Sequence, residues 1–174
     1  MTDKRKLVAV AVAGVAAVAV VASSWRFLAP SPLQEEVTSA LDVPFEYFDG
    51  RPGNLADFAG TPIVINFWAS WCPPCVAEMP DFERVHARLG QDVAFLGLAM
   101  QETNRAAAED LIEETGVTYA LGVDPDGSIF NRFGGIAMPT TVFVDSEGTV
   151  VTTHAGALFA EDLEEIIHDE LLTS

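Results

Sequence analysis

The first apolar segment of the chain is continuous rather than periodic. Residues 7–22 contain no polar side chain, and the 19 residues from Leu7 to Trp25 would span about 28 Å as a helix. A bilayer has a hydrocarbon core of roughly 30 Å. Basic residues at 4–6 precede the run, so we expect the N-terminus in the cytoplasm and the C-terminal domain outside the membrane.

This segment has two interpretations. In the first, residues 1–29 are a retained anchor that crosses the plasma membrane through 7–25, and the proline-containing stretch 30–42 is a linker. In the second, the segment is a cleaved secretory signal, because the small residues at 20–22 suit a signal peptidase. Both interpretations predict one exported domain over residues 43–174.

That domain alternates short apolar runs with segments of helical periodicity. The runs at 62–68 and 93–99 are rich in apolar residues on both faces, as in buried strands. We expect strands at 44–48, 62–68, 93–99, 117–123, 140–145 and 149–154, and helices at 73–89, 104–115, 126–133 and 160–172. Helices between parallel strands, followed by an antiparallel hairpin, predict an α/β domain with a mixed sheet.

The charge is strongly acidic. The chain has 26 acidic and nine basic residues, a formal net charge of −17, and beyond residue 30 it has five arginines, no lysine and 25 acidic residues. Such a domain repels phosphate, which excludes nucleic acid as a partner. The acidity is typical of a solvated surface, and adaptation to a salt-rich habitat is the alternative.

Candidate chemistry is concentrated at Cys72 and Cys75, the only two cysteines of the chain. They follow a predicted buried strand and begin a predicted helix, where Pro73 and Pro74 suit a first turn that needs no backbone donors. A crosslink over so short a loop stabilises by only about 2 kcal/mol, which favours a redox switch over a structural crosslink. The helix N-terminus favours a thiolate at Cys72, the expected nucleophile, and Cys75 is the expected resolving thiol.

Two alternatives for this pair stay open. The first is a static disulfide in an exported protein, and the second is half of a zinc site. A site built wholly from cysteines needs four thiolates, and none of the three histidines stands at a recognised ligand spacing from the pair.

The segment FWASWCPPC, residues 67–75, resembles the active site of the thioredoxin-like superfamily. Residues 78–80 (EMP) and 135–141 (GIAMPTT) resemble landmarks of the TlpA/ResA-type membrane-anchored thiol–disulfide oxidoreductases, and the resemblance covers about 43–172. It implies a thioredoxin-like fold, a mixed central sheet flanked by helices, with an N-terminal β-hairpin and a central αβ insertion at about 93–123.

The same resemblance implies roles for individual residues. Pro139 should be cis and lie beside the cysteines, leaving the backbone of Met138 free to pair with an extended client segment. We expect Trp71, with Pro73, Pro74 and Met138, on the docking surface. Packing of Trp71 under the loop is the alternative, and Trp68 is expected in the core.

One position departs from the thioredoxin pattern. Thioredoxins carry a buried Asp that assists proton transfer to the resolving thiol, and Asn66, which cannot titrate, stands there instead. ResA-like proteins place a Glu of the insertion near the site. Glu102 is the nearest match, with a raised pKa and a proton to exchange with Cys75. Gln101 is the alternative occupant, and a solvated Glu102 is the alternative role.

The resulting hypothesis is an extracytoplasmic thiol–disulfide oxidoreductase that reduces exported proteins, such as apocytochrome c, with electrons from a membrane donor. It implies no metal, haem or flavin, only the Cys72–Cys75 dithiol–disulfide pair. Two other classes remain open. One is a copper-handling metallochaperone, which would want a longer cysteine spacing and a placed histidine, and the other is a non-catalytic binding domain with a structural disulfide.

Overall fold

The computed structural model describes residues 41–173, all of which belong to one compact unit of the chain. The expected membrane segment at 7–25 and most of the expected linker lie outside these residues. Within the described range, no helix combines the length and apolar character needed to cross a bilayer. Leu41 is already buried in the core, so the packed domain begins before Val43.

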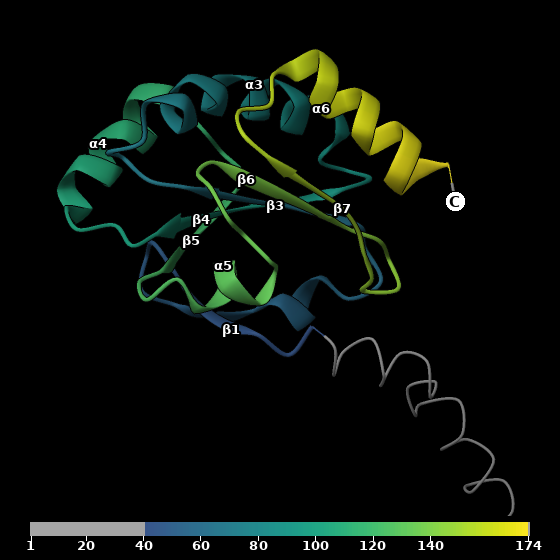
Figure 1. Ribbon diagram of the computed structural model, residues 1–174, viewed down its shortest axis with the longest axis horizontal. Coiled ribbons are helices and arrows are strands. Elements are labelled where there is room, and N and C mark those ends of the chain that lie inside the picture. The colour runs from purple at the N-terminus through teal and green to yellow at the C-terminus, as the bar shows by residue number, and fades with distance from the viewer. Residues whose placement is uncertain (1–40, 174) are drawn as a thin grey trace, which may run out of the picture. The chain divides into compact units, whose positions relative to one another are not determined.

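A seven-stranded mixed sheet forms the centre of the domain (Figure 1). The strands run in the order β2-β1-β5-β4-β3-β6-β7, with β3, β4 and β5 parallel and the other pairs antiparallel. Their bounds are β1 Pro44–Tyr47, β2 Pro52–Asn54, β3 Ile63–Trp68, β4 Ala94–Met100, β5 Ala120–Asp124, β6 Thr140–Val144 and β7 Val150–Ala155. The thioredoxin-like fold with a leading hairpin is therefore confirmed.

Helices cover both faces of this sheet (Figure 1). Their bounds are η1 Leu55–Phe58, α3 Pro73–Leu89, α4 Arg105–Thr115, α5 Ser128–Arg132, α6 Ala160–Ile167 and η2 His168–Leu172. One core cluster joins α3, α4 and α6 to the sheet, and a second joins η1 and α5 to its other face. The predicted elements are all present, although β5 begins three residues later than expected because Val117 and Tyr119 pack in the core as irregular chain.

Strand β3 supplies both cores because successive side chains of a strand point to opposite faces. Val64 and Trp68 belong to the core under α3, whereas Ile63, Ile65 and Phe67 belong to the other core. Asn66 has the same parity as Val64 and Trp68, so it lies on the α3 face. It is 1% exposed, which places an amide in the middle of an apolar layer.

Candidate active site

Cys72 and Cys75 form a disulfide at the junction between β3 and α3, with their Cα atoms 5.3 Å apart. Cys72 is the N-cap residue of α3 and keeps an extended backbone, and the two prolines occupy the first helical positions as predicted. Cys75 is the first residue of the buried face of α3, which continues through Glu78, Met79, Phe82 and Val85. The local sequence thus places one sulfur at the helix end and the other inside the core.

The two cysteines differ in access to solvent. Cys72 is 4% exposed and Cys75 is 0% exposed, so Cys72 is the member of the pair that meets solvent at all. Trp71 beside it is 52% exposed, and Pro73 and Pro74 are exposed as well. Trp71 is therefore a surface residue at the disulfide, whereas Trp68 is wholly buried in the core, as expected.

The loop before β6 carries the predicted cis proline. The Met138–Pro139 peptide bond is cis, and the Pro139 carbonyl accepts a hydrogen bond from Gly156 N at 2.9 Å. Among residues 41–173, neither the amide nor the carbonyl of Met138 forms a main-chain hydrogen bond. Ile136, two residues earlier, is 87% exposed, an unusual position for a large apolar side chain and one that the sequence interpretation did not single out.

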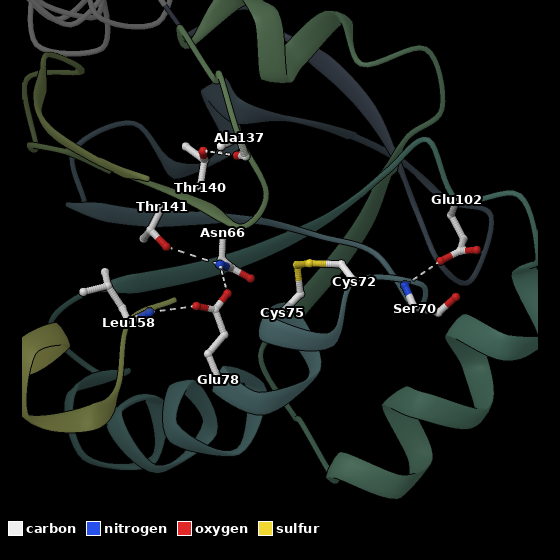
Figure 2. Close-up of a disulfide and its surroundings, with 10 residues drawn as sticks. All are labelled: Asn66, Ser70, Cys72, Cys75, Glu78, Glu102, Ala137, Thr140, Thr141 and Leu158. Atoms are coloured by element: carbon white, nitrogen blue, oxygen red, sulfur yellow. Dashed lines mark hydrogen bonds between the residues drawn. A yellow bond between two sulfur atoms is a disulfide. The ribbon is translucent and has the colours of Figure 1, made fainter. Parts of the chain in front are cut away.

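Glu102 lies on the Cys72 side of the disulfide (Figure 2). Its Oε2 accepts a hydrogen bond from Ser70 N at 2.8 Å, and its Oε1 accepts one from Asn104 N at 2.9 Å. Burial alone would raise the pKa of Glu102, but these amide donors outweigh it and hold the pKa below its ordinary value. The expectation that Glu102 has a raised pKa is wrong, because the carboxylate is fixed as an anion that anchors the loop before Cys72. Gln101 is exposed, with φ of 49°, and does not take the buried place either.

The buried carboxyl group of the site is Glu78, on the Cys75 side of the disulfide (Figure 2). Its Oε1 accepts a hydrogen bond from Asn66 Nδ2 at 2.8 Å, and its Oε2 accepts one from Leu158 N at 2.9 Å. Burial raises the pKa of Glu78 to about 7, and the two donors only partly oppose that effect. Glu78 therefore changes its protonation near neutral pH, which is the property expected of a group that exchanges protons with a thiol.

Glu78 was missed as a proton-exchanging residue, although the sequence contained a signal for it. Positions three apart on a helix lie on one face with their Cβ atoms about 5–6 Å apart. Cys75, Glu78 and Met79 follow that spacing, so a helix that buries Cys75 also buries Glu78. A charged residue on the apolar face of a CxxC helix is the pattern that would have identified it.

A cavity of about 520 Å³ opens on the Glu102 side of the site. It lies at the carboxyl ends of β4 and β5, and its lining includes Phe48, Glu102, Arg105 and Asp126. Arg105 donates to the Phe48 carbonyl and pairs with Glu109. His86 is away from this region, packed against Phe95 and Tyr119 with ring centroids 5.3 and 5.8 Å apart.

A family model described as Redoxin matches residues 36–167. The chain belongs to the Redoxin family. Its resemblance to ResA-type, thioredoxin-like thiol–disulfide oxidoreductases is thereby confirmed, and relatives in this family carry names of that class.

Two of these relatives are curated proteins. The thiol-disulfide oxidoreductase ResA of Bacillus thuringiensis subsp. konkukian is 29% identical over 120 residues, covering 68% of this chain and 69% of the relative. The thiol:disulfide interchange protein DsbE homolog of Paracoccus denitrificans is 38% identical over 99 residues, covering 57% of this chain and 53% of the relative.

Solved structures agree with this assignment. A secreted Mycobacterium tuberculosis disulfide oxidoreductase homologous to Escherichia coli DsbE superposes with a TM-score of 0.69 at 27% identity, covering 75% of this chain and 98% of that one. StoA from Bacillus subtilis superposes with a TM-score of 0.62 at 25% identity, covering 71% and 93%. This protein is therefore a thiol–disulfide oxidoreductase by family, fold and cysteine pair.

Proposed function

We propose that this protein works outside the cytoplasm and reduces disulfides of exported proteins through Cys72 and Cys75. The observation that carries the proposal is that Cys75 and the carboxyl group of Glu78, whose pKa burial raises to about 7, both lie on the buried face of α3, three residues apart. The relatives include one protein described as secreted, which supports the location. Apocytochrome c is a candidate client, and a membrane thiol–disulfide protein is the candidate electron donor.

The first step is capture of the client. The Cys72 thiolate, favoured by the N-terminus of α3, attacks one sulfur of the client disulfide. A Cys72–client disulfide forms, the client S–S bond breaks, and the other client sulfur leaves as a thiolate that takes a proton from water. Trp71 and Ile136 offer apolar contacts, and the free main-chain groups of Met138 pair with the client backbone as an added strand.

The second step is resolution. Cys75 gives its proton to Glu78 and attacks Cys72 Sγ as a thiolate. The Cys72–Cys75 disulfide forms, the Cys72–client disulfide breaks, and the client sulfur leaves as a thiolate that takes a proton from water. Two electrons pass from the protein to the client. A base next to Cys75 accelerates this step and, by microscopic reversibility, also its reverse. Glu78 therefore raises the rate of exchange, and the potential of the cysteine pair sets its direction.

The mechanism predicts different outcomes for the two cysteine variants. In an insulin-reduction assay, Cys72→Ser should lose all activity, because no nucleophile remains at the surface. Cys75→Ser should also stop turning over, but it should accumulate mixed disulfides that resolve on a non-reducing gel. Full activity in Cys72→Ser would contradict the mechanism.

The direction of transfer is tested by the equilibrium potential in a thiol–disulfide buffer. If the protein is a reductant, the reduction potential of its disulfide should be closer to about −270 mV than to the roughly −120 mV of strong oxidants of this fold. A reduction potential below about −300 mV would indicate a structural disulfide instead. Clients are identified by trapping them on Cys75→Ser in the native host.

A further inference from the structure

The side-chain amide of Asn66 is only half satisfied. Its Nδ2 donates to Glu78 Oε1 at 2.8 Å and to Thr141 Oγ1 at 3.2 Å. Its Oδ1 is buried and has no hydrogen-bond partner among residues 41–173. A buried amide oxygen without a donor is costly, so its persistence at this position calls for a functional reason.

The unpaired oxygen has a defined direction. In Figure 2 the nitrogen of Asn66 faces Glu78 and Thr141, whereas its oxygen points toward the Cys72–Cys75 disulfide. A disulfide has no hydrogen to donate, so in this oxidised state the oxygen stays unpaired. Reduction creates an S–H on Cys75, which is a donor of the type that the oxygen lacks.

We propose that Asn66 is the hydrogen-bond partner of Cys75 in the reduced protein, and that its amide turns over when the proton of Cys75 passes to Glu78. This inference rests on the proposed function and assigns Asn66 a positioning role in its second step. The residue that replaces the buried Asp of thioredoxins thus orders the proton transfer without itself titrating.

The two positions of the proton, on Cys75 or on Glu78, each match one orientation of the Asn66 amide. Before transfer, Asn66 Nδ2 donates to the Glu78 carboxylate, and Oδ1 accepts from the Cys75 thiol. After transfer, Oδ1 accepts from the Glu78 carboxylic acid, and Nδ2 donates to the Cys75 thiolate. One proton moves from sulfur to carboxylate, no other bond changes, and the thiolate is then free to attack Cys72.

The surroundings of Asn66 tolerate this exchange. The Thr141 hydroxyl can accept from Nδ2 in one orientation and donate to Oδ1 in the other. Leu158 N holds the second oxygen of Glu78 in both states. Tyr119 interacts electrostatically with Glu78, and its pKa is raised by burial and by the carboxylates of Glu78 and Glu83, so it stays neutral. Asp81, three residues after Glu78 on α3, accepts from Ala160 N.

The test is the pKa of Cys75, measured from the pH dependence of alkylation in the Cys72→Ser background. The hydrogen bond to a thiolate is charge-assisted and stronger than that from a thiol, a weak donor, so Asn66 favours the thiolate. Asn66→Leu should therefore slow alkylation of Cys75 at pH 7 about tenfold. An unchanged titration of Cys75 would overturn the proposal.

The matched control is Asp81→Asn. Asp81 also lies on α3 and also accepts from a backbone amide of the 158–160 segment, Ala160 N at 2.9 Å, but one turn further from the cysteines. This variant should leave the Cys75 titration unchanged. A shift equal to that of Asn66→Leu would mean that loosening α3 is sufficient and would contradict a specific role.

Coupling to Glu78 is tested by a double-mutant cycle. With Glu78→Gln present, Asn66→Leu should slow alkylation less than twofold, because the orientation of the amide no longer follows a proton. Full additivity of the two substitutions would overturn the proposal.

If Asn66→Leu fails to fold, the proposal can be tested on the unmutated protein. The side-chain ¹H–¹⁵N resonances of Asn66 should shift on reduction and then titrate together with Cys75. Side-chain resonances of Asn66 whose chemical shifts do not change on reduction would overturn the inference. None of these readouts requires turnover, so a protein that reduces no client but shows them would refute the proposed function alone.

Discussion

Two carboxyl groups on opposite sides of one disulfide have opposite pKa shifts. Glu78 is wholly buried and receives two hydrogen bonds, which do not compensate for its loss of solvent. Glu102 is only partly buried, and its amide donors outweigh the effect of burial. The balance between desolvation and donors therefore assigns the raised pKa to Glu78 and the lowered pKa to Glu102, the carboxylate that anchors the loop before Cys72.

These shifts predict a pH signature in the stability of the oxidised protein. The folded-state pKa of Glu78 is about 7 against an ordinary value of 4.5. Its contribution to stability is therefore full below pH 4.5 and is lost as the pH rises through 7, by roughly 3 kcal/mol. Glu78→Gln removes this dependence. In denaturant titrations, the free energy of unfolding of Glu78→Gln minus that of the unmutated protein should rise by roughly 3 kcal/mol between about pH 4.5 and 8.

Glu102→Gln is the control. The substitution is again Glu to Gln, but the pKa of Glu102 is lowered rather than raised, so the stability should depend on pH in the opposite direction. A lowered pKa gives stability that is present above the ordinary pKa and lost as the pH falls through the folded value. This variant should therefore be most destabilised near neutral pH and least in acid. If both variants followed the same trend with pH, the assignment of the two carboxyl groups would be wrong.

At the scale of the element, α3 is both the catalytic helix and a support for α6. Phe159, the N-cap residue of α6, provides no side-chain cap. Asp81 of α3 accepts from Ala160 N in its place and also pairs with Arg84, while Arg88 pairs with Glu164 on α6. The cap of one helix is thus supplied by its neighbour.

This cap predicts a loss of stability without a loss of chemistry. Asp81→Ala should lower the free energy of unfolding by about 1 kcal/mol, the usual effect of removing an N-cap side chain. Insulin reduction at a temperature well below the transition should stay within about twofold of the unmutated rate, because the partners of Asp81 are Ala160 N and Arg84 rather than residues of the site. A large fall in rate with unchanged stability would show that Asp81 belongs to the site.

At the scale of the whole molecule, the dominant property is negative charge. Residues beyond 30 carry five arginines and 25 acidic residues, and acidic side chains such as Glu46, Glu102 and Asp126 line the cavity beside the site. A field of this sign attracts cations and repels anions over about a Debye length, roughly 10 Å at 0.1 M salt.

The field predicts a choice among clients. A disulfide peptide with flanking lysines should be reduced at least about tenfold faster than the matched peptide with flanking glutamates at low ionic strength. The difference should shrink toward unity as salt approaches 1 M, since screening removes the field. Stopped-flow rates for the two peptides across a salt series give the answer, and equal rates at low salt would exclude electrostatic selection.

Most local structure of this domain was predictable from sequence. The apolar run at 62–68, the helical spacing over 73–89 and the glycine at 116 predicted β3, α3 and the end of α4, because period, length and cap residues act locally. The CxxC pair was found because redox chemistry requires two cysteines at a fixed spacing, whereas the cis proline at 139 was implied by the family resemblance. The thioredoxin-like fold was implied by the resemblance, and the order of the strands came only from the structure.

The buried partner of Cys75 was decided only by the tertiary structure. Glu78 and Glu102 are the same residue type near the same cysteines, and desolvation and donor geometry distinguish them: Leu158 and Asn66 on one side, Ser70 and Asn104 on the other. The sequence alone identified the thiol pair, because two cysteines at a helix start are a local property. Which carboxyl group is buried beside that pair was decided by contacts between segments up to 80 residues apart, since burial is a property of the folded whole.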